Sequence, residues 1–250
     1  TPTLSVQLNT LHYAVSHLSK LEDSISEKWL KKRPSEKLDE GSLDDKSQCF
    51  DGGRKAINAA IDRICEYTGI KIVFWDLKEP FIDNLYKPSA SQSRLESLME
   101  PLDLALHELC SIIVEPLRNQ LVTSLLQASL DGLLRVLLDG GPSRVFSPSD
   151  AKLFVEDLEI LEEFFICGGD GLPHELVENL TEHPRMIINL LSFETQELIE
   201  EMKSVGGLEQ GGKSKLGDNA KTLLKILCHR GDAEASKFVK KHFKVPKSAA

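Results

Sequence analysis

Apolar residues recur at every third or fourth position along most of the chain, which is the period of an amphipathic α-helix. The pattern starts in the segment from Thr3 to Lys32, which is long enough for about 45 Å of helix at about 1.5 Å per residue. The apolar positions of this segment are Leu4, Leu8, Leu11, Val15, Leu18, Ile25 and Trp29. Because such a stripe is normally covered by other helices, we expect this segment to belong to a bundle.

A polar stretch then interrupts the pattern, and we predict a mobile loop over residues 31–53, which include Pro34 and Gly41. A second helix is predicted after this loop, with Gly69 as its end. The residues expected to face inward in this helix are Ala56, Ile57, Ala60, Ile61, Ile64 and Cys65.

The segment from Ile70 to Ser91 is the one candidate for a β-strand, because it contains the apolar run Ile72–Trp75. The run alternates poorly between apolar and polar residues, and a single short strand cannot form a sheet. A buried helix or an extended linker is therefore an equally good interpretation of this segment.

Two longer helices are predicted next. The first covers Leu95 to Ile113, with Pro101 as a candidate kink, and the second runs from Leu117 to Gly140. Both carry leucines at three-four spacing, and a glycine directly after the last apolar position is a common helix end.

The residues Ser147–Asp150 are typical of a helix start, because the serine can cap the helix and Pro148 suits its first position. The buried stripe predicted for this helix comprises Phe154, Leu158, Leu161 and Phe165. Two short helices are expected to open at Pro173 and Pro184, and two or three more complete the chain. Since no second strand signal appears, the sequence predicts an all-α fold, a bundle of about eight to ten helices.

The composition is typical of a globular protein, with 41% hydrophobic and 28% charged residues. The net charge of −9 argues against a dedicated nucleic-acid-binding protein, which needs a basic face to neutralise phosphates. No continuous apolar run approaches the roughly 18 residues of a membrane span, and no signal peptide is recognisable. The five cysteines are widely spaced without a C-x-x-C pair, so we expect reduced, mostly buried thiols in a cytosolic protein.

Charge is unevenly distributed along the second half of the chain. From Asp150 to Glu201 there are 14 acidic and 2 basic residues, whereas from Lys221 to Ala250 there are 8 basic and 2 acidic residues. One interpretation is an acidic, solvated face that packs near basic helices at the end of the chain. The other is a basic site for anionic lipid or an acidic partner, formed by Lys237, Lys240, Lys241 and Lys244.

The residues Gly207–Ser214 match the phosphate-binding pattern G-x-x-x-x-G-K-[ST], which suggests a nucleotide hydrolase that uses Lys213 and Ser214. That chemistry needs a strand before the glycines and a helix that starts at the Lys-Ser pair. Here the preceding residues are typical of a helix, and Asp218 signals a helix start further on. We therefore favour a flexible connector over residues 205–217, with nucleotide hydrolysis as the alternative. No other spacing typical of a catalytic set occurs, so we predict neither an enzyme nor a cofactor.

The connector from Gly140 to Phe146 joins two strongly apolar helices. The two glycines end the first helix, Pro142 prevents its continuation, and Arg144 is placed to bond free carbonyl groups or acids nearby. One interpretation is a rigid corner between two helices. The other is a partner-binding surface formed by Gly140, Gly141, Pro142, Arg144 and Phe146.

Two long segments resemble proteins of the MUN-domain (Munc-homology) family. The first is Leu130–Pro173, LDGLLRVLLDGGPSRVFSPSDAKLFVEDLEILEEFFICGGDGLP, which resembles the second Munc-homology region of these proteins. The second is Tyr67–Glu96, YTGIKIVFWDLKEPFIDNLYKPSASQSRLE. Both are most similar to the plant branch of the family, the PATROL-type proteins of proton-pump translocation control.

The resemblance implies an elongated helical rod akin to subunits of vesicle-tethering complexes, with an N-terminal bundle segment over residues 1–116 and a Munc-homology bundle over residues 117–250. It implies a non-enzymatic tethering or priming factor in exocytosis, which supports delivery of membrane proteins such as the proton pump to the plasma membrane. The partners that the resemblance implies are SNARE or exocyst-type tethering proteins. From the charge pattern we add an anionic membrane surface as a further candidate, and we expect no nucleic acid and no small-molecule substrate. The implied location is the cytoplasm, peripherally on endosomal vesicles and the plasma membrane.

Overall fold

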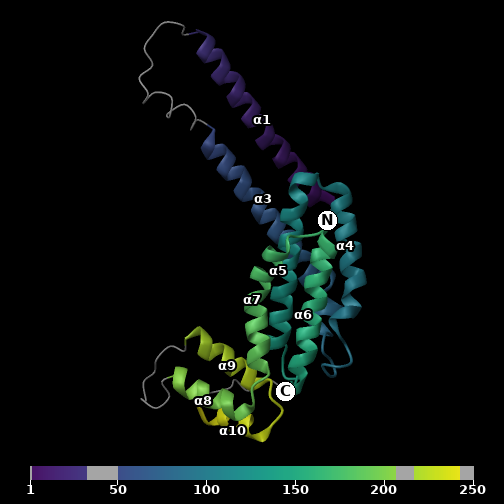
Figure 1. Cartoon of the computed structure of the whole chain (residues 1–250), viewed down its shortest axis with the longest axis vertical. Coiled ribbons are helices and arrows are strands. Elements are labelled where there is room, and N and C mark those ends of the chain that lie inside the picture. Colours follow the sequence, from purple (N-terminus) through teal and green to yellow (C-terminus); the bar gives the residue numbers. More distant parts are fainter. Residues whose placement is uncertain (1, 33–49, 207–216, 243–250) are drawn as a thin grey trace.

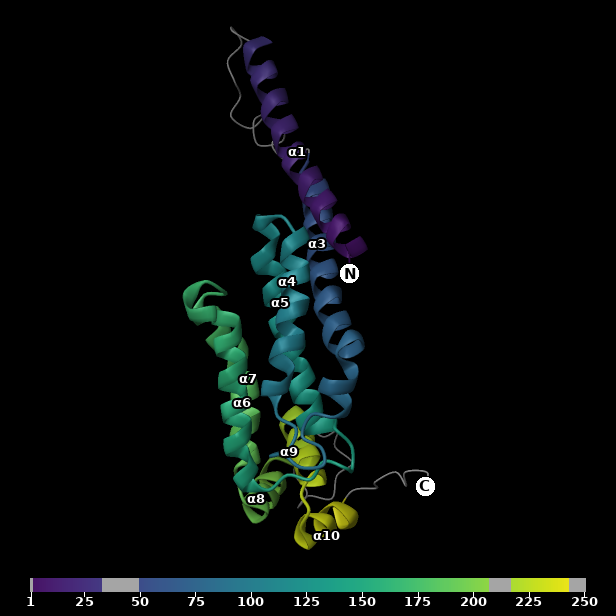
Figure 2. The same cartoon turned by 90° about the vertical axis from the view of Figure 1, so that its right-hand side faces the viewer.

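The computed structural model describes residues 2–32, 50–206 and 217–242, and every regular element in these ranges is a helix. The molecule is elongated in both views (Figures 1 and 2). Helix α5 (Glu115–Asp139) runs along the middle of the body and contacts α3, α4, α7 and α9. The prediction of an all-α helical bundle is therefore confirmed.

Helices α1 (Pro2–Lys32) and α3 (Asp51–Lys71) form an antiparallel pair that projects from one end of the body (Figure 1). An ion pair between Arg54 and Glu22 joins the two helices in the projecting part. The apolar stripe predicted for α1 is buried or half-buried near the body, whereas Ile25 is exposed further out. The expected packing of this stripe in a bundle is therefore right for its first part only.

Helix α3 is longer at both ends than the sequence predicts. Gly52 and Gly53, assigned above to the loop, lie in its first turn, and the helix continues past Gly69. A Cβ atom at Gly69 would lie 2.5 Å from the backbone oxygen of Ser124 on α5, so this glycine permits a close approach of two helices rather than a helix end. The predicted mobile loop of residues 31–53 is also too long at its start, because Lys31 and Lys32 belong to α1. Residues 33–49 of this loop lie outside the described residues.

The candidate strand is instead two stretches of π-helix that continue α3, namely η1 (Ile72–Asp76) and η2 (Lys78–Asp83). The strand interpretation is wrong because the apolar run turns around a helix axis, which leaves Trp75 71% exposed. A π-helix pairs residue i with i+5, and the same spacing occurs in the ion pairs Lys71–Asp76 and Lys78–Asp83, each at 2.7 Å.

Helix α4 (Met99–Ile112) follows a short 3-10 turn, η3 (Leu95–Leu98). Pro101 is the third residue of α4, where the missing N–H has no intrahelical acceptor, so the helix continues through the proline without a break. The first turns of α1 are held against the end of α4. The Asn9 side chain donates to the Ile112 carbonyl at 2.8 Å and accepts from the Val114 N–H at 3.0 Å.

Helix α5 ends at Gly140, as predicted. It is long and apolar enough to cross a membrane by length and composition, and 56% of that apolar window is buried inside the protein. Burial on several sides of the helix explains its apolar composition, since α5 is the central helix of the core.

Helix α6 (Ala151–Ile166) begins where the sequence predicts it, after the turn η4 (Pro148–Asp150). The Asp150 carboxylate accepts the Ser147 backbone N–H at 2.8 Å, so the expected capping interaction is confirmed. The predicted stripe is also confirmed, because Phe154, Leu158, Leu161 and Phe165 are all buried. The helix ends at Cys167, which has a left-handed backbone and opens the turn η5 (Cys167–Gly169).

Helix α7 (His174–Leu191) packs against α6 and begins directly after Pro173, as expected. The separate helix predicted to open at Pro184 is wrong, because α7 runs through this residue. Pro184 lies on the buried face of α7 together with Val177 and Ile188, and an unbroken helix keeps these residues on one side.

Three short helices close the end of the body opposite the α1–α3 pair (Figure 1). They are α8 (Thr195–Gly206), α9 (Asp218–Cys228) and α10 (Ala233–His242), and each contacts the other two. The end of the acidic stretch therefore lies beside the basic helices, as the first interpretation of the charge distribution predicts.

Candidate functional site

The predicted corner between α5 and α6 is built around a buried arginine. Arg144 is only 3% exposed, and its guanidinium donates to three backbone carbonyls, those of Ile82 and Gly140 at 2.7 Å and that of Leu85 at 2.9 Å. Desolvation by burial lowers the pKa of Arg144, and the nearby Asp83 carboxylate opposes this shift. The arginine thus joins the end of α5 to the segment after η2.

The other side of the corner is fixed to the turn between α9 and α10. The Phe146 N–H donates to the His229 carbonyl at 2.9 Å, and the Arg230 guanidinium donates to the Phe146 carbonyl at 3.1 Å. The His229 ring stacks on Phe146, and its Nδ1 donates to the Arg144 carbonyl at 2.8 Å, since a carbonyl can only accept. The connector is therefore held on both sides by hydrogen bonds to backbone carbonyls, most of them donated by side chains.

These contacts favour the rigid-corner interpretation. The side chains of Arg144 and Phe146 point inward and are buried, and Gly140 and Gly141 are half-buried. The exposed part of the corner is Pro142 with its neighbours Ser143 and Val145. A partner-binding role for this surface stays a prediction.

A buried carboxylate lies close to this corner and was not recognised in the sequence. Asp157 on α6 is fully buried and accepts the Tyr86 hydroxyl at 2.7 Å, the Arg94 Nη2 at 2.6 Å and Nε at 2.8 Å, and the Leu95 N–H at 3.3 Å. Burial first, and then the neighbouring Asp157 carboxylate, raise the pKa of Tyr86 well above its ordinary value. The sequence does contain a signal for the burial of Asp157. Asp157 lies three residues after Phe154, which places it on the same helix face as the apolar stripe.

The nucleotide-binding interpretation lacks the context that its chemistry needs. The connector predicted over residues 205–217 begins too early, because Val205 and Gly206 belong to α8. Residues 207–216, including Lys213 and Ser214, lie outside the described residues. The segment before them is helix α8 rather than a strand, and α9 begins at Asp218 rather than at the Lys-Ser pair, as the sequence predicts. The helix N-terminus that should face a phosphate is thus displaced from the pattern.

Three of the four basic residues proposed for lipid or an acidic partner lie on one side of α10. Lys237, Lys240 and Lys241 are exposed, and Lys244 lies outside the described residues. The opposite side, with Ala235, Phe238 and Val239, is buried against α8 and α9. Three-four spacing therefore presents these three lysines together on the surface.

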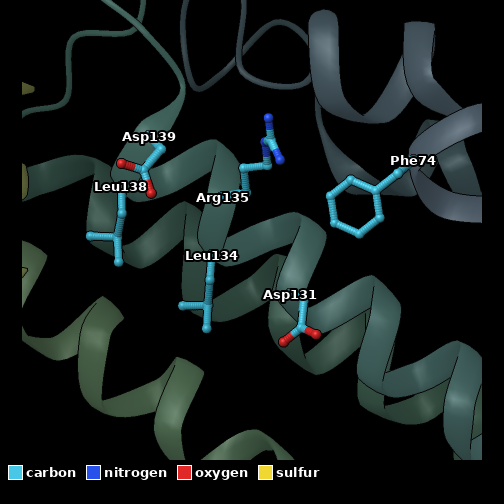
Figure 3. Close-up of a pocket in the computed structure, with 6 residues that line it drawn as sticks. All are labelled: Phe74, Asp131, Leu134, Arg135, Leu138 and Asp139. Carbon is cyan, nitrogen blue, oxygen red and sulfur yellow. The ribbon is translucent and has the colours of Figure 1, made fainter. Parts of the chain in front are cut away.

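A shallow pocket of about 560 Å³ lies between η1 and the second half of α5. Figure 3 shows that Asp131, Arg135 and Asp139 follow one another along α5, with Phe74 facing them from η1. The Arg135 guanidinium lies 5.8 Å from the centre of the Phe74 ring, and Asp139 forms an ion pair with Lys225 of α9 at 2.7 Å. The charged groups at this pocket thus already contact the protein itself.

A second surface groove, of about 630 Å³, lies between α4, α5 and the end of α6. Apolar side chains form most of its lining, and its edges carry acidic residues. Neither the hydrophobic pattern nor any motif predicts this groove, because its residues come from three separate helices.

The cysteines are less buried than predicted. Cys65 is buried and Cys110 is half-buried, whereas Cys167 and Cys228 are exposed, and all four are free thiols. Cys49 lies outside the described residues. Within the described ranges, no group of three or more His, Cys, Asp or Glu side chains is placed to hold a metal ion.

Comparison with known proteins gives two matches. A family model described as PATROL1-like, TPR repeats, matches residues 1–249. The chain is also similar to an Arabidopsis thaliana protein named Protein unc-13 homolog, with 59% identity over 257 residues that cover 99% of this chain. The chain spans 23% of the length of that relative.

Proposed function

Since the chain belongs to the PATROL1-like, TPR-repeat family, we propose that it is a non-enzymatic helical module of a vesicle-tethering or priming factor in exocytosis. The observation that carries this proposal is the match of the family model along almost the whole chain. The name of the Arabidopsis thaliana relative groups that protein with unc-13 proteins, which agrees with a trafficking factor. An all-helical body with several exposed helix faces also suits protein–protein contacts.

In this proposal the protein works in the cytoplasm, on the surface of endosomal vesicles and the plasma membrane. It supports the arrival of membrane proteins such as the proton pump through contacts with SNARE or exocyst-type tethering proteins. The MUN-domain resemblance of residues 67–96 and 130–173 supports this part of the proposal.

The test uses cells in which the gene for this protein is disrupted and then restored. The density of a fluorescently tagged proton pump at the plasma membrane is expected to fall on disruption and to recover on re-expression, while the total amount of pump stays constant. Co-precipitation with SNARE and exocyst subunits reports the partners. An unchanged pump density, with no recovered SNARE or exocyst subunit, would contradict the proposal.

A second candidate function, binding to anionic membranes, is favoured by the exposed lysines of α10. Lys237, Lys240 and Lys241 share one surface, and basic residues near a membrane each contribute about 1 kcal/mol of attraction to anionic lipid. Membrane attraction of this size is additive only while all three side chains face the same plane, as the helix spacing allows.

Vesicle sedimentation tests this second function. The chain is mixed with phosphatidylcholine vesicles with and without phosphatidylserine, and we expect sedimentation only with the anionic lipid. Replacing Lys237, Lys240 and Lys241 with glutamate is expected to abolish it. A control with the same charge change, Lys20→Glu, Lys55→Glu and Lys152→Glu on other exposed sites, is expected to retain it. Equal loss in both variants would indicate a net-charge effect and remove the α10 site.

A further inference from the structure

The groove between α4, α5 and the end of α6 has an apolar floor that is open to solvent. Met99, Leu106, Val122 and Phe164 line it, and each is a partly buried residue that packs on the core. Ile160 lines it as well and is half-buried. Its volume of about 630 Å³ lies in the usual range for binding pockets, roughly 300–1,000 Å³.

The edges of this groove are acidic. Asp103 on α4, Glu163 on α6 and Asp170 after η5 all line it, and no lysine or arginine does. Glu159 is exposed one turn before Glu163 on α6 and extends the acidic edge. Neither Asp103 nor Glu163 forms an ion pair with a described residue, so both carboxylates are available to a cation.

From this geometry we propose that the groove binds an amphipathic helix of a partner protein whose apolar face is flanked by lysine or arginine. The occupant is a helix because an apolar groove that lies between packed helices accepts side chains at three-four spacing. Its flanks are basic because the three carboxylates at the edges attract cations and repel acidic segments. This inference goes beyond the proposed function, since the chemistry of the groove does not depend on a role in vesicle traffic.

The probe is a designed, fluorescein-labelled helical peptide of about 18 residues, roughly five turns. It carries leucine at positions i, i+4, i+7 and i+11 and lysine on both flanks, and its counterpart has the same leucines with glutamate on the flanks. Fluorescence anisotropy with the full chain is expected to show binding of the lysine peptide and about tenfold weaker binding of the glutamate peptide. Equal affinity for the two peptides would overturn the proposal.

Two variants test the site itself. Asp103→Lys with Glu163→Lys is expected to abolish the preference for the lysine peptide, because the two new lysines balance Asp170 and Glu159 at the groove edges. The control Glu182→Lys with Glu201→Lys makes the same change of net charge at exposed acidic positions outside the groove, and it is expected to leave the preference unchanged. Circular dichroism and thermal melting verify that each variant is folded. A folded Asp103→Lys, Glu163→Lys variant that still prefers the lysine peptide contradicts the assigned site.

The cysteines of the chain provide a footprint for the same site. Cys167 lines the groove and is exposed, whereas Cys228 is exposed but lies outside it. Saturating lysine peptide is expected to slow iodoacetamide labelling of Cys167 several-fold and to leave Cys228 unchanged. Unchanged labelling of Cys167 despite measurable binding would mean that the peptide occupies another surface.

A second copy of the chain is the competing occupant. Light scattering after gel filtration, over a range of protein concentrations, measures self-association. Two results together would assign the groove to self-association and overturn the proposal. The first is a dimer that Ile160→Glu abolishes, and the second is that the lysine peptide does not dissociate this dimer. A monomer at all concentrations, together with peptide binding that Ile160→Glu abolishes, supports it.

Discussion

At the scale of single residues, Asp157 shows how a buried charge is accommodated in this fold. Its two oxygens accept hydrogen bonds from Tyr86, Arg94 and the Leu95 backbone, so the desolvated carboxylate is compensated by four donor atoms. The cluster joins α6 to the segment between η2 and α4, elements that lie far apart in the sequence. It therefore fixes tertiary structure rather than a local turn.

Asp157→Asn is expected to destabilise the protein by about 3–5 kcal/mol, because the amide replaces an acceptor with a donor and leaves Arg94 without its buried partner. Tyr86→Phe removes one hydrogen bond to the carboxylate and is expected to cost less, about 1.5–3 kcal/mol. Urea unfolding followed by circular dichroism gives both values.

The control for this cluster is Glu156→Gln, which removes the negative charge from the exposed ion pair with Arg94 (3.1 Å) and is expected to change stability little. If Asp157→Asn changed the free energy of unfolding as little as Glu156→Gln, the buried Asp157 network would not stabilise the fold.

The thiols give a second prediction at this scale. Burial, assisted by the nearby Asp62 and Glu66 carboxylates, raises the pKa of Cys65 to about 11. Only the thiolate reacts with iodoacetamide, so at pH 8 roughly a thousandth of Cys65 is reactive even where reagent reaches it. We expect mass spectrometry to find Cys167 labelled and Cys65 unlabelled at pH 8, with Cys65 labelled after urea is added. Rapid labelling of Cys65 in the folded protein would contradict its burial.

At the scale of helices, the sequence predicts the elements whose apolar stripe is long and whose ends carry strong signals. Helices α5 and α6 are of this kind, with Gly140 and the Ser147–Asp150 turn as their boundaries. The predictions fail at Gly69 and Pro184, where a residue that normally ends a helix lies inside one. Local propensity is a weak prior that tertiary packing overrides, and the contacts that override it involve partners distant in the sequence.

In the candidate sites too, contacts between residues close in the sequence are predictable, whereas contacts between distant residues are not. Bonding of Arg144 to free carbonyl groups is predictable, because one acceptor is Gly140 at the end of the preceding helix. The Asp157 network is not predictable in this way, since its partners Tyr86 and Arg94 lie 71 and 63 positions away. The groove beside α4 is missed for the same reason.

Gly69 gives a prediction at the helix scale. Gly69→Ala places a methyl group 2.5 Å from the Ser124 backbone oxygen, so α3 must move away from α5, and we expect a loss of about 1–3 kcal/mol. The matched control is Gly52→Ala in the first turn of the same helix, where nothing lies within 4 Å of the new Cβ. There the alanine is expected to stabilise by about 0.5–1 kcal/mol. Thermal unfolding measures the change in stability that the same Gly→Ala substitution causes at the two positions. Equal changes at Gly69 and Gly52 would refute the close approach of α3 and α5 at Gly69.

At the scale of the whole molecule, the three C-terminal helices share the apolar core with the body and are also joined to it by buried polar groups. Arg230 donates to the carbonyls of Leu191 at 2.7 Å, Phe193 at 2.8 Å and Phe146 at 3.1 Å. It thus connects the α9–α10 turn to the end of α7 and to the corner before α6. Its Nε is buried and has no hydrogen-bond partner among the described residues, so burial of the guanidinium carries a desolvation cost. The three hydrogen bonds and the nearby carboxylates of Asp232, Glu194 and Asp150 offset this cost.

We expect Arg230→Met to loosen α8, α9 and α10 as one unit while the body stays folded. Methionine keeps an apolar stem like that of arginine but removes all three bonds to backbone carbonyls, so local opening should become at least about tenfold more frequent. Hydrogen exchange followed by mass spectrometry measures the frequency of local opening. We expect faster exchange than in the unchanged protein in residues 195–206 and 218–242, and an unchanged exchange rate in α5 and α6. The control is Lys225→Met, which removes the solvent-exposed ion pair of α9 with Asp139 and is expected to change exchange little. Acceleration across the whole chain in Arg230→Met would mean that the three helices and the body unfold together, because local opening would then be as costly as global unfolding.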